Sequence, residues 1–426
     1  MRLVYLLIVS LLPLLAHAEL SPIERQIAAY ARDSKEDAIR LLEEVVNINS
    51  GTMNHAGVKA VGDVFARELE ALELSTRWHD MSEVNRAGHL FAENDGGGTC
   101  QLLIGHLDTV FEPQSEFQQF QRDGDLATGP GVNDMKGGNV VIVFALKALL
   151  KAGVLNDGKY IVALIGDEEK SGSPKSISRR HLVDAARQCD IALGFEIATS
   201  LNAATVARRG SSGWRLDVTG RQAHSAGIFS EDVGAGAVFE AARILSRFYQ
   251  EVRGEEYLTF NPGIIIGGTE VSYDPEINAG SVSGKTNIVA RDLVVHGGLR
   301  TISPRQETEA REKMRAIAES DNLPGTSASI EFFEGYPAMP PTPGNMALLS
   351  VLSGVSEDLG YGEVTAYDPG KRGAADVSFV AEYVDVIDGI GAEGNGAHAP
   401  GESIDLSTLP MLIERAAILM YRLSIQ

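Results

Sequence analysis

The 426-residue sequence is short of basic side chains, of aromatic residues and of cysteines. Its 37 Lys and Arg residues face 58 Asp and Glu residues, and the formal net charge at pH 7 is −21. A surface this acidic argues against binding to nucleic acid or to anionic lipid, because like charges repel. With 44% hydrophobic and 22% charged residues the chain has the composition of a globular protein, and its length favours two domains.

Long apolar runs are also missing, except at the start of the chain. Arg2 is followed by an apolar run over residues 3–15 and then by Ala16-His17-Ala18. This order predicts a secretory signal peptide, residues 1–18, that is cleaved after Ala18. A membrane anchor is the alternative, but 13 residues fall short of the roughly 20 that span a bilayer. We therefore expect a periplasmic or secreted protein with no membrane segment after cleavage.

The two cysteines, Cys100 and Cys189, each precede an apolar, strand-like run. An exported protein can pair them, yet cysteines in such positions are often simply buried. A sequence does not supply the geometry that a disulfide requires. We expect two free thiols, with a disulfide as the alternative.

Helical and strand-like patterns alternate through the first half of the chain. The spacing of apolar residues predicts helices at 22–50, 58–74, 138–152 and 174–187. Short apolar runs lie at 89–92, 102–105, 160–166 and 190–195. Such continuous runs are typical of strands that are buried on both faces of a parallel sheet. The alternation predicts an α/β fold in three layers, with a mostly parallel sheet in the middle.

The pattern changes near residue 205. Residues 207–336 read as strand, helix, two strands, helix and strand, a βαββαβ order that is typical of a separate α+β unit. Its first strand, 212–219, alternates so that Trp214 and Leu216 share one face with Val218. The α/β pattern resumes afterwards, with helices near 345–358 and 409–423 and a strand near 384–389. We therefore predict a first domain made of residues 19–206 and 337–426, into which residues 207–336 are inserted.

Polar residues follow the apolar runs where strands are expected to end. His106 and Asp108 end the run 102–105, and residues two apart on a strand face the same side. A metal-bound imidazole usually donates its second ring proton to a carboxylate, so His106 is interpreted as a ligand and Asp108 as the residue that orients it. The alternative is an ordinary surface or turn histidine.

Asp134 lies in the glycine-rich stretch 129–138, directly before an expected helix. The stretch lacks the Lys-Ser/Thr spacing of a phosphate-binding loop. Asp134 is either a helix cap or a carboxylate that bridges two metal ions in a crowded turn where the glycines are needed.

Three glutamates and two histidines complete the candidate set. Glu168 and Glu169 follow the strand-like run 160–166, and adjacent residues point in opposite directions, so one can bind a metal while the other faces a water molecule. Glu196 ends the run 190–195, and His398 lies in a glycine-rich loop. Exposed acidic turns and a plain loop histidine are the alternatives for these positions. His224 belongs to the inserted unit, where a direct metal ligand is not expected.

In this order, the motifs resemble those of the di-zinc metallopeptidase family that includes glutamate carboxypeptidase, aminoacylase, acetylornithine deacetylase and succinyl-diaminopimelate desuccinylase. The similarity covers the mature chain and looks closest to periplasmic glutamate carboxypeptidases. It implies two zinc ions per subunit. By matching motifs, His106 and Glu196 would bind one ion, Glu169 and His398 would bind the other, and Asp134 would bridge the two.

The resemblance also implies roles outside the metal ligands. Glu168 would be the general base that removes a proton from a metal-bridging water to give the attacking hydroxide, and Asp108 would orient His106. The inserted unit would be a lid that forms a homodimer, and His224 and Asn287 on it would contact the substrate. A cis peptide is expected after Asp134.

The implied reaction is hydrolysis of an amide bond that releases a C-terminal amino acid, with glutamate as one candidate, from a small peptide or N-acyl amino acid. One departure concerns specificity: the family's substrate-binding Arg after the last lid strand is missing from residues 333–337. Our hypothesis is that Arg372 takes over recognition of the substrate carboxylate. The alternatives are a dipeptidase or aminopeptidase of the same family and a non-catalytic periplasmic binding protein.

Overall fold

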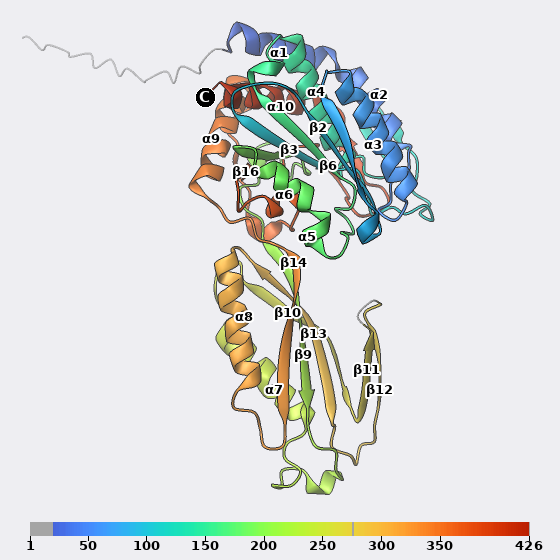
Figure 1. The fold of residues 1–426 in the computed structure, drawn as a ribbon, viewed down its shortest axis with the longest axis vertical. Helices are drawn as coiled ribbons and strands as arrows, with labels where there is room; N and C mark the ends of the chain where they lie inside the picture. Colours follow the sequence, from blue (N-terminus) through green and yellow to red (C-terminus); the bar gives the residue numbers. More distant parts are fainter. Residues whose placement is uncertain (1–19, 275–276, 426) are drawn as a thin grey trace, which may run out of the picture.

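The computed structural model describes residues 20–274 and 277–425, so the expected signal peptide lies outside the described residues. A six-stranded sheet with the order β1-β2-β6-β3-β7-β16 forms its centre (Figure 1). The strands are β1 (Ser75–Met81), β2 (Arg86–Glu93), β3 (Cys100–His106), β6 (Lys159–Ile165), β7 (Ile191–Gly194) and β16 (Asp385–Ile387). The four strands from β6 to β16 run parallel, whereas β2 pairs with β6 in antiparallel register. The carboxyl ends of β3, β6 and β7 therefore meet at one edge of the sheet.

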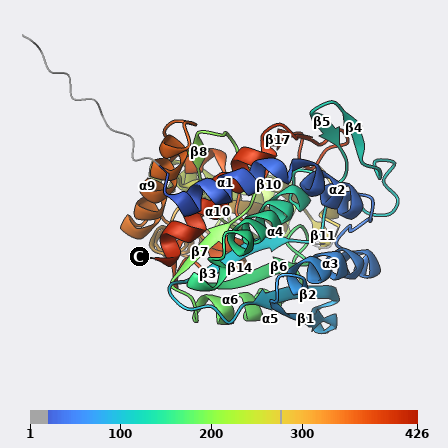
Figure 2. The same ribbon diagram turned by 90° about the horizontal axis from the view of Figure 1, so that it is seen from above.

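Helices cover both faces of this sheet, which gives the three-layer α/β architecture expected from the sequence (Figure 2). One face carries α1 (Pro22–Asp33), α2 (Lys35–Val46), α3 (His55–Glu70), α4 (Lys136–Lys151), α9 (Pro343–Asp358) and α10 (Leu409–Ser424). The other face carries α5 (Lys175–Ser178) and α6 (Arg180–Ala186). Leu103 of β3 packs in the core under the first group, whereas Leu102 and Ile104 pack with Leu182 of α6. This alternation explains why β3 is apolar on both faces.

Helix α4 is the most deeply buried helix next to the site. Its residues 136–146 are all buried, because α1, α2 and α10 pack around it. The helix begins two residues after Asp134 and therefore fixes that residue against the end of the sheet.

Two helices expected from the sequence are each divided in two. The pattern over 22–50 forms α1 and α2, which break at Ser34, and the pattern over 174–187 forms α5 and α6, which break at Arg179. The Ser34 hydroxyl donates to the carbonyl of Ala31, a local bond that competes with a continuous helix. Arg179 is held by buried carboxylates instead.

Residues 210–336, called the distal segment below, extend away from the central sheet (Figure 1). Their antiparallel sheet has the order β10-β13-β9-β14. Its elements are β9 (Gly210–Thr219), α7 (Ala237–Arg247), β10 (Thr259–Gly268), β13 (Asp292–Thr301), α8 (Pro304–Glu319) and β14 (Ser327–Tyr336). Trp214, Leu216 and Val218 are buried together in a core of their own, as their alternation predicts. The hairpin of β11 (Glu270–Asp274) and β12 (Ala279–Ser283) was not expected.

A small four-stranded sheet lies beside the site end of the central sheet. Its strands are β4 (Gln121–Asp123), β5 (Leu126–Thr128), β17 (Gly394–Asn395) and β18 (Ser403–Asp405), in the order β17-β18-β5-β4. The turn between β17 and β18 carries His398.

The expectation of two free thiols is wrong, because Cys100 and Cys189 form a disulfide with a Cα–Cα distance of 4.5 Å. Strands β3 and β7 are parallel neighbours in the sheet, so the residues at their starts lie side by side. Among the described residues, no helix is both long and apolar enough to cross a membrane.

Candidate active site

The site begins with His106, the last residue of β3, whose imidazole is almost fully buried. Because β3 lies between β6 and β7, the histidine stands at the middle of the sheet's carboxyl edge. Its Nδ1 lies 3.0 Å from the carbonyl oxygen and 3.5 Å from Oδ1 of Asp108. These contacts leave Nε2 pointing outward from the sheet.

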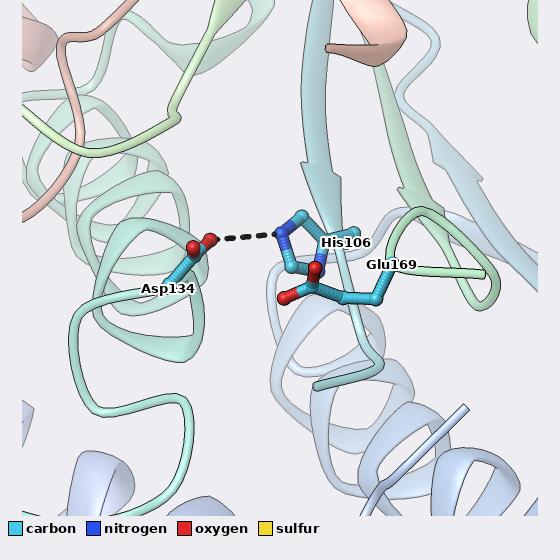
Figure 3. A group of neighbouring side chains, drawn as sticks. All are labelled: His106, Asp134 and Glu169. Carbon is cyan, nitrogen blue, oxygen red and sulfur yellow. Dashed lines mark hydrogen bonds and ion pairs between the residues drawn. The ribbon is translucent and has the colours of Figure 1, made fainter. Parts of the chain in front are cut away.

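Asp134 lies between two histidines. Its Oδ1 is 3.2 Å from Nε2 of His106, and its Oδ2 is 3.1 Å from Nε2 of His398. Figure 3 shows its carboxylate facing the His106 ring from the opposite side of the site. The peptide bond between Asp134 and Met135 is cis, as the resemblance implied. One carboxylate with a different imidazole beside each oxygen is compatible with a bridge between two metal ions, each bound by one of the histidines.

Two glutamates extend the arrangement on either side of Asp134. Glu169 Oε2 is 3.1 Å from Nε2 of His398, and Glu196 Oε1 is 3.8 Å from Nε2 of His106. One ligand atom from each of His106, Asp134 and Glu169 lies within 4.8 Å of the others (Figure 3). The five residues that the sequence singled out as ligands therefore converge on one place, although they come from four separate loops and one strand end.

Asp108 is fully buried and holds the loop that follows β6. Its two carboxylate oxygens accept the backbone N–H groups of Glu168 at 3.0 Å and Glu169 at 3.1 Å. The hydroxyl of Thr52 donates to Oδ2 at 2.6 Å. Asp108 therefore fixes both the His106 ring and the two glutamates, a wider role than the sequence indicated.

Glu402 holds the loop that carries Asp134. Its buried carboxylate accepts the backbone N–H groups of Gly131 at 3.0 Å and of Asn133 and Asp134 at 2.8 Å each. Because Glu402 lies four residues after His398, it ties the two loops on either side of the site together. Burial raises the pKa of Glu402 to about 7.

Burial and mutual repulsion shift the pKa values of the carboxylates at the site. Burial and then the charge of Asp134 raise the pKa of Glu196 to about 7. Burial and then Asp376 raise the pKa of Glu168 well above its usual range. Hydrogen bonds from His398 to Asp134 and Glu169 raise the pKa of that histidine to about 11. Buried negative charge in this amount calls for compensating cations.

The donor set fits divalent metal ions. Two imidazoles and three carboxylates are linked by N–O distances of 3.1–3.8 Å, and Oε1 of Glu169 is buried without a hydrogen-bond partner. A mixed nitrogen and oxygen set of this kind suits zinc as well as other transition metals. The residues therefore fit a two-metal centre.

Arg372, in the loop that precedes Asp376, is partly buried. Its guanidinium donates to the carbonyl of Ile197 at 3.2 Å, whereas its Nε has no partner. Burial and the charge of Arg208 lower the pKa of Arg372, while Asp388 and, after it, Glu196 and Asp134 of the cluster act in the opposite direction. The residue is within electrostatic range of the cluster and keeps unused donor capacity.

His224 and Asn287 lie elsewhere. Strand β9 starts at Gly210, next to Ala338, and runs away from the central sheet for ten residues, roughly 30 Å. His224 follows the far end of that strand and is exposed, and the carbonyl of Asn287 accepts a hydrogen bond from Ser225 N–H at 2.9 Å. The structure brings these two together but does not bring them to the cluster of their own chain.

Several residues of the site were not found from the sequence. The side-chain amide of Asn139 donates to the carbonyl of His106 at 2.6 Å, and Lys136 donates to the carbonyl of Ile48 at 3.0 Å. Thr52 and Glu402 act on backbone or carboxyl groups more than fifty residues away in the chain. A single sequence carries no signal for such contacts, because nothing in the local spacing marks them.

Residues 102–422 match the model of peptidase family M20/M25/M40. The chain belongs to this family. The match covers more than half of the sequence and includes every residue of the cluster. The M20-family chain is therefore a metallopeptidase, and the cluster is its candidate metal centre.

Two curated relatives have names that describe different activities. The chain is 26% identical to carboxypeptidase G2 of a Pseudomonas strain over 396 residues, 92% of this chain and 90% of the relative. It is 24% identical to a probable succinyl-diaminopimelate desuccinylase of Staphylococcus aureus over 305 residues, 68% and 70% of the two chains. Both relatives are hydrolases by name, and they differ in substrate.

Two solved structures share the fold. Aminopeptidase PepT of Bacillus cereus superposes with a TM-score of 0.70 at 17% identity, covering 91% of this chain and 99% of its own. The YXEP protein of Bacillus subtilis, described as a dinuclear metal binding peptidase from the M20 family, superposes with a TM-score of 0.64 at 15% identity, covering 92% and 98%. The three-layer α/β fold with a mainly parallel sheet is thus that of the family.

Proposed function

We propose that this metallopeptidase hydrolyses an amide bond and releases a C-terminal amino acid, with glutamate as one candidate, from a small peptide or N-acyl amino acid. The observation that carries the proposal is Asp134, whose two carboxylate oxygens each face a different histidine. The 26% identity to carboxypeptidase G2 supports the release of a C-terminal residue.

His106 and Glu196 would hold one metal ion, Glu169 and His398 would hold the other, and Asp134 would be shared. We propose Zn²⁺ for both positions, because imidazole and carboxylate are common zinc ligands. Bound divalent ions supply two kinds of chemistry: they lower the pKa of a water molecule and they polarise a carbonyl.

Glu168 is the proposed general base. It neighbours Glu169, yet no hydrogen bond ties its carboxylate to the cluster, while its backbone N–H is held by Asp108. Glu168 takes the proton of the attacking water and then passes it to the leaving amine. The raised pKa of Glu168 reflects burial and the neighbouring carboxylate of Asp376, and it favours a group that keeps a proton between these two steps.

Arg372 is the proposed partner of the substrate carboxylate. A guanidinium binds a carboxylate through two parallel hydrogen bonds, and the Nε of Arg372 is left without a partner. The segment 333–337, where the family's substrate-binding Arg was expected, contains no Arg.

The distal segment is proposed to act as a lid and as the surface of a homodimer. His224 and Asn287 lie too far along it to reach the cluster of their own chain, so a partner subunit would bring them to the substrate. Exposed apolar side chains on the segment support association: Phe229 is 68% exposed, Phe239 50% and Val238 49%. In this arrangement His224 would stabilise the oxyanion that forms as the amide is attacked.

Export to the periplasm or outside the cell is proposed from the first 18 residues. The disulfide between Cys100 and Cys189 supports the proposal, because disulfides persist in oxidising compartments.

The proposal is tested by product analysis with mass spectrometry of the zinc-loaded mature protein. The substrates are N-acyl amino acids, N-aroyl glutamates and free dipeptides. Release of the C-terminal amino acid from N-blocked substrates is expected. Cleavage of free-amine peptides alone would instead assign a dipeptidase or aminopeptidase, and no cleavage of any amide would contradict the proposal.

A further inference from the structure

The main chain of Glu168 is held from two directions. Its N–H donates to Asp108, which follows β3, at 3.0 Å. Its carbonyl oxygen accepts the hydroxyl of Tyr336 at 2.8 Å. Tyr336 is the last residue of β14, so the second contact comes from the distal segment, at the point where that segment joins the central sheet.

The bonding of the Tyr336 hydroxyl is fully determined by its partners. A phenol has one proton to donate and can accept two hydrogen bonds. Arg179 Nη2 donates to the hydroxyl oxygen at 3.0 Å, and Ser171 Oγ lies at the same distance. Because the carbonyl oxygen of Glu168 can only accept, the single phenol proton goes to Glu168, and Ser171 must therefore donate to Tyr336, as Arg179 does. All three hydrogen bonds that the hydroxyl can make are therefore formed, two with the loop after β6 and one with Arg179.

Arg179 holds Tyr336 in place and is itself fixed by two ion pairs. It is nearly fully buried and binds Asp167, which directly precedes Glu168, and Asp376. The second oxygen of Asp167 accepts Gly172 N–H at 2.7 Å and Ser178 Oγ at 2.6 Å. The hydrogen bond from Gly172 to Asp167 thus joins the two ends of the loop 167–172, and Tyr336 connects this loop to the distal segment.

The chain is shaped to direct Tyr336 into this network. The pairing of β14 with β9 shifts register between Phe333 and Tyr336, and such irregularities re-aim side chains. A Cβ on Gly335 would lie 1.5 Å from the carbonyl oxygen of Ser211, so only glycine permits this close approach. The Tyr336 ring packs edge-on against Phe379, with centroids 5.0 Å apart.

We propose that Tyr336 is a positioning residue for Glu168: its hydroxyl fixes the carbonyl of the proposed general base and links the base of the distal segment to the reacting loop. This inference deepens the proposed function and rests on it, because it assumes that Glu168 carries the proton. Misplacement of a catalytic group by about 1 Å can lower the rate about 10²-fold. Because Tyr336 contacts the main chain of Glu168 and no metal ligand, its loss should act on turnover more than on substrate binding.

The test is Tyr336→Phe, which removes the hydroxyl and keeps the ring. The matched control is Tyr361→Phe, which removes a hydroxyl that donates to the buried carboxylate of Glu414 at 3.0 Å, away from the site. For the N-blocked substrate that wild type cleaves best, we expect kcat of Tyr336→Phe to fall about tenfold or more, with KM within about twofold and metal content unchanged. The control should keep its kcat.

Hydrogen–deuterium exchange supplies a readout that does not depend on activity. Backbone amides of residues 166–173 should exchange at least several-fold faster in Tyr336→Phe than in wild type or in Tyr361→Phe. Unchanged exchange would overturn the proposal. Faster exchange with unchanged kcat would also overturn it, because Tyr336 would then be only structural. If wild type cleaves no amide at all, the proposed function fails, while faster exchange would still establish the contact between Tyr336 and the loop.

Discussion

At the carboxyl edge of the central sheet, most residues of the metal cluster are buried or partly buried, although the side chain of His398 is 58% exposed, and the loops that carry them are held by further side chains. At the tip of the distal segment, His224 and Asn287 are exposed and bonded only to their own neighbours. Both regions carry residues that the family resemblance assigns to one reaction. The structure of a single chain thus brings the proposed metal ligands together but leaves His224 and Asn287 far from them, so under the proposed function these two residues would have to act in the site of a partner subunit.

The hydrogen bonds explain why the first region is preorganised. The Glu402 carboxylate accepts three backbone N–H groups from the loop 131–134, and Asp108 accepts the N–H groups of Glu168 and Glu169. Buried carboxylates that accept several backbone N–H groups are fixed in place, and they fix the loops that they bind. No comparable support holds His224, whose ring accepts one bond from Ala226 N–H at 3.2 Å.

The largest effect is expected from Asp134→Asn, which breaks the metal-binding region itself. The amide keeps the shape of the carboxylate but loses the charge that two cations would share, so metal content should fall below two ions per chain. Turnover should fall to the level of chelator-treated wild type. Metal analysis by mass spectrometry and kcat measure this. Asp123→Asn, on the exposed strand β4, is the control and should keep both ions.

Glu168→Gln is expected to lower kcat by about a thousandfold, because a general base contributes ~10²–10⁴-fold. Zinc content should stay near that of wild type, since Glu168 is not proposed as a ligand. Loss of zinc in this variant would show that Glu168 is a metal ligand and would contradict its assignment as a general base outside the ligand set.

His224→Ala tests the second region and should lower kcat by about 10²-fold or more, the usual effect of losing an oxyanion donor. If His224 serves a partner's site, unfolding and refolding a 1:1 mixture of His224→Ala and Glu168→Gln should restore about a quarter of wild-type activity in a symmetric dimer. Mixtures that stay inactive would place the residue in its own chain or outside the reaction. A monomer in solution would contradict the comparison between the two regions.

Arg372→Ala should have the smallest effect, a rise in KM of roughly tenfold for substrates that carry a free carboxylate, with little change in kcat. The matched substrate is the corresponding amide, for which KM should not change. Arg372→Lys should recover only part of the loss, because an ammonium lacks the planar fork. An unchanged KM for carboxylates would rule out the proposed role.

Much of the fold follows from apolar runs that are local in the sequence. The strands around His106, Glu168 and Glu196 were expected, and the structure has β3, β6 and β7 at these places. Trp214 and its neighbours are buried as their alternation predicts. The breaks within helices were less predictable. Ser34 ends α1 beside a hydrogen bond to the nearby carbonyl of Ala31, whereas Arg179 lies between α5 and α6 and binds Asp376, which is distant in the chain.

The sequence alone predicted that His106, Glu169 and Glu196 would lie together, because polar residues that follow neighbouring parallel strands meet at the carboxyl edge of the sheet. Asp134 and His398 lie in loops, and their place in the set followed from the family resemblance. How these groups are held, and which distant residues contact them, depends on the tertiary structure. Glu402, Thr52 and Tyr336 act through hydrogen bonds between segments that are far apart in the chain. The disulfide depends in the same way on β3 and β7 being neighbours, which is a property of sheet order and not of spacing along the sequence.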